Sequence, residues 1–212
     1  MVSVTIFAMV MVVALGALLT ISASERKAET LKSVMTNLNF AMDSMSRSIR
    51  TGVNYDGFNC SPSSLPVSAI PTATDCSTGT GTYAIAFQAV QASLPSCVVN
   101  QPCVVTYCRG NGSTCSASGT SILRSIYNGT ANSGFLPITS SELLISNLSF
   151  YVKGAPRGDS LQPRVTITIS GYIPLNGGAA TQSACIGQGS SATSQCSAFN
   201  IETTVTQRLY DQ

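Results

Sequence analysis

The sequence contains no histidine, and charged residues make up only 9% of its 212 residues. Without an imidazole the chain cannot form a Ser-His-Asp or Cys-His couple or bind a metal through histidine. The formal net charge of +2 is too small to create the positive field that nucleic acids or anionic membranes usually require. These absences exclude most hydrolase chemistries, and the composition gives no sign of a nucleic-acid partner.

Catalysis by two carboxylates needs no histidine, as in glycoside hydrolysis. The acidic residues beyond residue 50 include Asp56, Asp75, Glu142, Asp159 and Glu202. None of them lies in a recognisable motif, and acids of this kind are usually solvated surface residues. We therefore expect a protein that is not an enzyme, with no catalytic residue, no cofactor and no metal site.

Eight cysteines all follow residue 50, and none of them belongs to a Cys-x-x-Cys spacing. An even number of cysteines with such spacing favours disulfides. A structural zinc site is the alternative, but it needs thiolates or imidazoles in close pairs, whereas Cys97, Cys103, Cys108 and Cys115 are separated by five, four and six residues. Disulfides persist outside the reducing cytosol, so this part of the chain is expected in the periplasm or outside the cell.

The order of these cysteines along the chain suggests their pairing but does not determine it. Pairing between neighbours would close loops rich in Ser, Thr and Gly, and each bridge would add about 2 to 4 kcal/mol by restricting the unfolded chain. We favour the neighbouring pairs Cys60–Cys76, Cys97–Cys103, Cys108–Cys115 and Cys185–Cys196. An interlaced arrangement of the four central cysteines is the alternative.

The first 24 residues carry no charge, and residues 6–21 are almost wholly apolar. As a helix, this region spans about 34 Å, close to the hydrocarbon core of a bilayer. A cleavable signal peptide is the alternative, because Ser22 and Ser24 are small residues at a suitable spacing. However, the apolar run is longer than a usual signal-peptide core, no basic segment precedes it, and the helical pattern continues past Ser24.

Beyond Ser24, apolar residues recur at steps of three and four, which predicts one helical stripe. Its members are Leu31, Val34, Met35, Leu38, Ala41, Met42, Met45 and Ile49. We expect six of them to pack against the rest of the protein, namely Leu31, Met35, Leu38, Met42, Met45 and Ile49. No proline precedes Thr51, and Thr51-Gly52 is an ordinary helix stop.

These patterns predict one helix of about 50 residues, roughly 75 Å long. Residues 1–23 would form a transmembrane or filament-core half, residues 24–52 an amphipathic half, and residues 53–212 a β-rich head. Arg26 and Lys27 follow the apolar run, so the positive-inside rule alone would place the head in the cytoplasm. The cysteines argue for the opposite orientation, and we expect the head outside the cytoplasm.

After Gly52 the apolar period changes to two, which predicts β-strands. Alternation is clearest in residues 83–89, 148–152, 165–169 and 201–207, with shorter candidates at Val104–Arg109 and Ser121–Tyr127. These strands would form a half-buried antiparallel sheet covered by the apolar stripe of the helix. The predicted fold class is α+β, with one long N-terminal helix packed on an antiparallel sheet whose loops are stapled by disulfides.

Residues 1–17, which read MVSVTIFAMVMVVALGA, resemble the interior of the type IV prepilin signature, with Phe7 at its late aromatic position. Residues 39–50 are similar to the pseudopilin segment that packs this helix into the head. Residues 164–171 and 199–208 are similar to paired closing strands of the same family. The chain therefore resembles type IV pilins and pseudopilins over its first and last quarters.

This resemblance implies a pilin-like fold and a structural role. The family's leader, processing glycine, methylated first residue and hallmark glutamate would all precede Met1; the alternative is that Thr5 replaces the glutamate. The implied protein is a minor pilin or pseudopilin of a type IV pilus or type II secretion-like filament. It would cross the cytoplasmic membrane once before assembly into a surface or periplasmic filament, with other pilin subunits and the assembly machinery as partners.

A signal-anchored or secreted adhesin-like binding domain is the alternative function. Its Ser- and Thr-rich loops would contact a surface ligand. This alternative predicts a monomer with no polymeric core of helices, whereas the pilin interpretation predicts contacts between the apolar halves of many copies.

Overall fold

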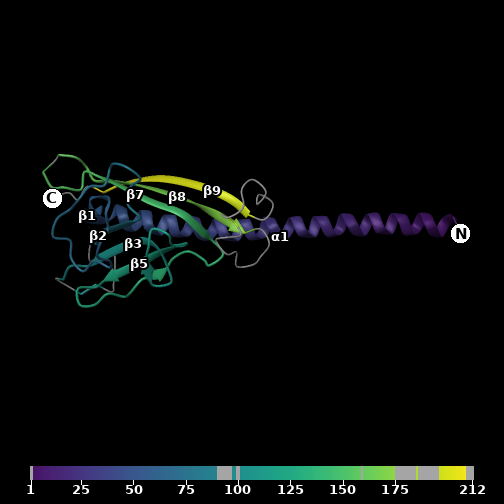
Figure 1. Ribbon diagram of the computed structural model, residues 1–212, viewed down its shortest axis with the longest axis horizontal. Coiled ribbons are helices and arrows are strands. Elements are labelled where there is room, and N and C mark those ends of the chain that lie inside the picture. Colours follow the sequence, from purple (N-terminus) through teal and green to yellow (C-terminus); the bar gives the residue numbers. More distant parts are fainter. Residues whose placement is uncertain are drawn as a thin grey trace.

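The computed structural model describes residues 2–89, 97–98, 101–158, 160–174, 185 and 196–208. One long helix, α1 (Val2–Arg50), is followed by a head built of β-strands. Figure 1 shows that the N-terminal half of α1 extends away from the head, whereas its second half lies along the strands. The expected α+β class is confirmed, with a long N-terminal helix, antiparallel strands and several disulfides.

Helix α1 continues for 49 residues and passes through Ser24 without a break. The segment contains no proline, and the hydroxyls of Thr30 and Thr36 donate to the carbonyls four residues earlier, which is compatible with a continuous helix. The helix ends at Arg50, two residues before Gly52. The single helix and its predicted stop are therefore confirmed.

The first sheet, called here the six-stranded sheet, has the order β1-β2-β3-β5-β6 with β4 paired to β3, and all its pairs are antiparallel. Its strands are β1 (Gly52–Asp56), β2 (Ala84–Ala89), β3 (Val104–Asn111), β4 (Thr114–Cys115), β5 (Ser121–Tyr127) and β6 (Leu136–Pro137). A short 3-10 helix, η1 (Phe58–Cys60), follows β1. The strands expected at residues 104–109 and 121–127 are confirmed.

The second sheet, called here the three-stranded sheet, contains β7 (Leu144–Lys153), β8 (Arg164–Pro174) and β9 (Cys196–Thr206) in antiparallel order. Residues along β8 alternate between buried and half-buried, as a strand with one face on the core should. Val152, Val165 and Val205 are paired across the three strands, and all are buried. The period-two segments 148–152, 165–169 and 201–207 are found here as strands, and the segment 83–89 forms β2 of the six-stranded sheet.

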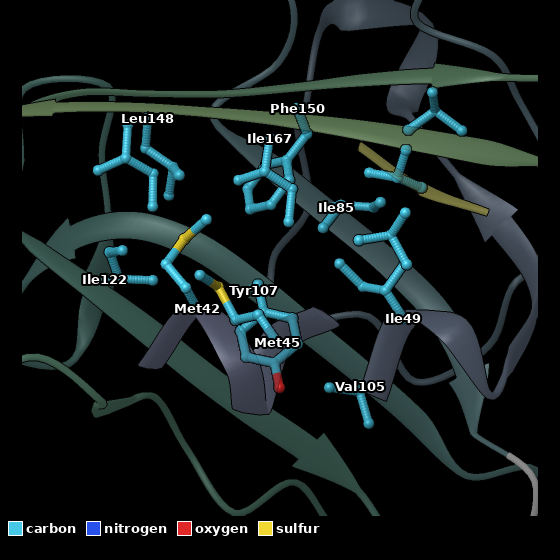
Figure 2. Close-up of a cluster of buried hydrophobic side chains, with 14 of the residues drawn as sticks. Met42, Met45, Ile49, Ile85, Val105, Tyr107, Ile122, Leu148, Phe150 and Ile167 are labelled. Atoms are coloured by element: carbon cyan, nitrogen blue, oxygen red, sulfur yellow. The ribbon is translucent and has the colours of Figure 1, made fainter. Parts of the chain in front are cut away.

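The prediction of a single sheet is wrong, because the strands form two sheets. The segment that precedes β2 makes isolated bridges to β7, in which Cys76 pairs with Val152 and Thr82 pairs with Phe150. The apolar stripe of α1 packs against both sheets, and each sheet covers part of it. Figure 2 shows side chains of α1 meeting side chains from both sheets in one core.

The shared core contains large side chains from all three parts of the fold. From α1 come Met42, Met45 and Ile49, from the six-stranded sheet Ile85, Val105, Tyr107 and Ile122, and from the three-stranded sheet Leu148, Phe150 and Ile167. Each of them is buried. Because the second half of α1 supplies one wall of this core, the head depends on that half for its own stability.

The six-stranded sheet is also apolar on its outer face. Ala84, Cys108, Leu123 and Phe135 form one small cluster there, and Ile70, Ala86 and Val104 form another. Phe58 contacts both clusters. The half-buried pattern predicted for the sheet is therefore wrong for β2, in which Ala84 to Phe87 are buried on both faces.

Among the six helix residues expected to pack against the head, Met35 is the exception. Its side chain is 38% exposed, whereas Val34 is 1% exposed and belongs to the core. At about 100° per residue, Val34, Leu38 and Met45 share one side of the helix, and Met35 falls at the rim of that side. The other five pack as expected: Leu38, Met42, Met45 and Ile49 are buried, and Leu31 is half-buried against the core.

The difference in burial between Met45 and Met35 can be tested by substitution. Met45→Ala removes a fully buried side chain and should lower the free energy of unfolding by about 2 to 5 kcal/mol, because a cavity remains in the core. The measurement is urea unfolding of the full chain in detergent micelles, followed by tyrosine fluorescence.

Met35→Ala is the matched control, because the same atoms are removed from an exposed site. It should change the free energy of unfolding by no more than about 0.5 kcal/mol. Equal losses from the two substitutions would contradict the packing described for α1.

Candidate functional site: the protruding and anchored helix

The first half of α1 displays large apolar side chains that contact nothing in the head. They are Ile6, Phe7, Met9, Val10, Met11, Val12, Val13, Leu15, Leu18, Leu19 and Ile21, with exposed fractions between 48% and 74%. The most hydrophobic 18-residue window of the helix is 0% buried. By length and composition this half is suited to crossing a membrane, and it is the one such helix in the described part of the chain.

The free-energy cost of exposing these side chains to water indicates which surroundings the helix requires. Leaving one large apolar side chain in water instead of burying it costs about 1.5 to 3 kcal/mol. Eleven such side chains together amount to a penalty on the order of 20 kcal/mol, which exceeds the stability of a typical domain. The protruding half therefore requires apolar surroundings, either lipid or other helices.

The other end of α1 is closed by hydrogen bonds to residues that follow it. The last four carbonyls of a helix have no partner within the helix. Here, the carbonyls of residues 47 and 48 accept from Thr51, that of Ile49 accepts from the Tyr55 hydroxyl at 2.6 Å, and that of Arg50 accepts from the Arg208 backbone N–H at 2.9 Å. Both β1 and the residues after β9 thus hold the end of the helix.

Tyr55 of β1 is the central residue of this junction. Its side chain is 1% exposed, its ring centroid lies 5.9 Å from that of Phe87, and its hydroxyl lies 2.6 Å from the Ile49 carbonyl and 2.7 Å from the Gly52 carbonyl. Burial raises the pKa of Tyr55 above its usual value. A side chain at position 52 would collide with the Phe87 ring, since a Cβ there would overlap a ring carbon.

Removing the Tyr55 hydroxyl should weaken the junction. Tyr55→Phe leaves the ring in place but removes the hydrogen bond to the end of α1, so the free energy of unfolding should fall by about 0.5 to 1.5 kcal/mol or more. Tyr127→Phe is the matched control, because its hydroxyl bonds within a surface turn, to Gly129. A loss at Tyr127 as large as that at Tyr55 would contradict this role.

The raised pKa of Tyr55 makes the free energy of unfolding depend on pH. The folded protein keeps this phenolic proton more tightly than the unfolded chain, which loses it near pH 10. The stabilisation that results from this difference in the pKa of Tyr55 is fully present below pH ~10 and decreases as the pH rises further. Urea titrations above that pH should show a steeper decline for the unsubstituted chain than for Tyr55→Phe; parallel declines would refute this.

The interface between α1 and the head also contains polar contacts. The Asn37 side-chain oxygen accepts from the Ser140 backbone N–H at 3.0 Å. The Tyr107 hydroxyl is buried and has no hydrogen-bond partner among the described residues. Burial raises the pKa of Tyr107, whereas the positive charge of the Arg124 guanidinium acts in the opposite direction. These groups lie within a largely apolar contact.

Comparison with protein-family models, with curated proteins and with solved structures found no match.

Four disulfides staple the loops of the head. They are Cys60–Cys76, Cys97–Cys103, Cys108–Cys115 and Cys185–Cys196, the neighbouring pairs that the sequence favours, and no cysteine is free. The first bridge closes on a turn in which Phe58, Asn59 and Cys60 all have positive φ angles, an uncommon backbone conformation for residues other than glycine. The described residues contain no group of three or more potential metal ligands.

The carboxylates that could take part in catalysis either accept hydrogen bonds in loops or are exposed at the surface. Asp56 accepts from the Phe58 backbone N–H and from the Thr74 hydroxyl. Asp75 accepts from the backbone N–H groups of Gly154 and Ala155. Glu142 and Glu202 are exposed at the surface, and Asp159 lies outside the described residues. The two partly buried acids thus have structural roles in the loops next to β1 and β7.

The Cys60–Cys76 bridge offers a test of how the head is held together. Replacing both cysteines by alanine opens a loop with a sequence separation of 16 and should lower the free energy of unfolding by about 3 kcal/mol. Urea unfolding under non-reducing conditions measures this loss. In the same experiment, alkylation of the unfolded, unreduced parent chain should label no cysteine; labelled cysteines would contradict the four pairs.

Sequence reasoning found the two halves of α1 but missed the junction. Tyr55 lies in a five-residue strand whose burial pattern follows no simple alternation. Arg208 takes part through its backbone N–H, which every residue other than proline possesses. A weak signal was available, since Tyr55 follows the predicted helix stop by only a few residues and is the first aromatic residue after it.

Proposed function

We propose that this chain is a structural subunit, a minor pilin or pseudopilin, of a type IV pilus or type II secretion-like filament. One observation carries the proposal: α1 is a single helix whose apolar half lies outside the head while its other half forms part of the core. A helix of this kind links a soluble head to apolar surroundings. Bundled apolar halves of many copies would provide those surroundings.

The resemblance of residues 1–17 to the prepilin signature supports this proposal. It implies a long N-terminal helix packed on a β-rich head, and that coarse arrangement is present here. The pilin family itself is inferred from these residues, since the fold class alone is shared by proteins of many functions. Four disulfides support a head that matures outside the cytoplasm, where they persist.

In this proposal, the chain first resides in the cytoplasmic membrane with its apolar half in lipid. Transfer from lipid into a helix bundle exchanges one apolar environment for another, so packing between helices decides the balance. The assembly machinery and other pilin subunits are the proposed partners. The function of the chain is then assembly and not catalysis.

Photo-cross-linking distinguishes a filament subunit from an anchored monomer. Phe7 is 63% exposed and lies near the start of the apolar run, so p-benzoylphenylalanine at this position reaches neighbouring chains if these halves pack together. Irradiation of membranes and of sheared filaments that contain the full chain should produce covalent dimers and a ladder of higher species on denaturing gels.

The same photoreactive residue at Phe58 is the control. Phe58 is half-buried against the outer face of the six-stranded sheet, so its cross-links should stay within one head and leave a monomer band. If Phe7 also yields only monomers, the filament proposal is refuted and the adhesin-like alternative, which predicts a monomer, is favoured.

A further inference from the structure

The strand edges of the head differ in how they are covered. Thr74 is hydrogen-bonded to the edge of β1, and β4 and β6 are each two residues long. The outer edge of β7 exchanges hydrogen bonds with Thr82 through Phe150 and with Cys76 through Val152. Natural sheets protect their edges in such ways, because a row of unpaired N–H and C=O groups accepts another strand.

β9 is the exception among the described strands. It is 11 residues long, its register with β8 contains no bulge, and Figure 1 shows it as the outermost strand of its sheet. The Gln207 N–H donates to the Pro163 carbonyl, which continues the β8–β9 ladder, so the odd-numbered residues of β9 direct their backbone groups to β8. The even-numbered residues direct theirs away from β8, and they include Ala198, Asn200, Glu202, Thr204 and Thr206.

The outward backbone groups of these five residues, called here the β9 edge, have no hydrogen-bond partner within the described part of the chain. Arg208, the next even-numbered residue, does have one, because its N–H donates to the Arg50 carbonyl at the end of α1. β9 contains no proline and no lysine, the residues that commonly protect an edge strand, and its one charged side chain is that of Glu202. The β9 edge can therefore accept another strand.

A second copy of the chain is a poor occupant of the β9 edge. β9 ends beside the end of α1 and runs in the same direction (Figure 1), so antiparallel pairing of two β9 strands would place the two apolar halves at opposite ends of the pair. A parallel pair would align the core face of one β9 with the exposed face of the other. The outer edge of β7 in a neighbouring copy is already bonded at Phe150 and Val152. These constraints favour a different polypeptide.

We propose that the β9 edge binds an extended segment of a partner protein, which joins the three-stranded sheet as an additional antiparallel strand. Phe199 and Ile201 lie on the core side of β9 and are only partly buried, so the added segment places apolar side chains on this face. On the other face it places a lysine or arginine opposite Glu202, because opposite charges across neighbouring strands are favourable. The partner segment thus alternates apolar and polar residues and carries a central cation.

The β9 edge is present whether or not the chain assembles into filaments. Only the argument against an antiparallel pair of copies rests on the proposed function, because it requires both apolar halves to enter one membrane. Photo-cross-linking at Phe7 tests assembly without involving β9, so the two proposals can fail separately.

The test uses the full chain in detergent micelles and a fluorescein-labelled peptide with the sequence of residues 164–174, the segment that pairs with β9 on its other side. Thr168→Lys in the peptide places a cation opposite Glu202, because residues 168 and 202 are paired in the ladder. Fluorescence anisotropy should show saturable binding. Hydrogen exchange of the backbone N–H groups within residues 196–206 of the chain should become slower when the peptide is bound.

Substitution of Thr204 tests whether binding uses the backbone of the β9 edge. Thr204→Pro removes one outward N–H and no hydrogen bond to β8, so it should weaken peptide binding about tenfold. Thr204→Val is the matched control, because it removes the hydroxyl that lies 2.9 Å from that of Thr166 but keeps the N–H. Its affinity should stay within about twofold of the parent chain. Urea unfolding confirms that both variants fold.

Glu202→Lys tests the position of the cation without changing the backbone. It should weaken binding of the lysine peptide about threefold and strengthen binding of a peptide with Thr168→Glu by a similar factor. No saturable binding, equal losses in the two Thr204 variants, or an unchanged charge preference would overturn the proposal. A dimer of the parent chain that sedimentation detects and Thr204→Pro abolishes would also overturn it, because the occupant would then be a second copy.

Discussion

The structure depends on one constraint: a 49-residue helix cannot bury both of its halves in a head of this size. The second half contributes Leu38, Met45 and Ile49 to a core shared by two sheets. The first half keeps its large apolar side chains exposed, at a penalty that exceeds the stability of a typical domain. The head and the second half of α1 thus form one folded domain, while the protruding half needs apolar surroundings.

Different parts of the head are stabilised in different ways. The helix is held by burial and by hydrogen bonds that occupy the last four carbonyls of α1, with Thr51, Tyr55 and Arg208 as donors. The loops around the sheets are held covalently by four disulfides. This division follows composition, because the loops are rich in small polar residues and have little apolar surface to bury.

Much of this architecture could be predicted from the sequence, and the failures have physical causes. The helix and the strands β7, β8 and β9 follow from regular periodicity. Met35 was misplaced because residues at the rim of a helical stripe have the same spacing as those at its centre. The division into two sheets and the junction at Tyr55 could not be predicted, because they depend on contacts between distant segments, such as Thr82 with Phe150 and Arg208 with Arg50.

Gly52 has a mechanical consequence. The Phe87 ring occupies the space where any side chain at this position would project, and Tyr55 fills the other side of the same junction. The end of α1 is therefore tied to β1 both by the chain and by the hydrogen bonds of Thr51 and Tyr55. Tension applied along the helix would reach the first strand through this short junction.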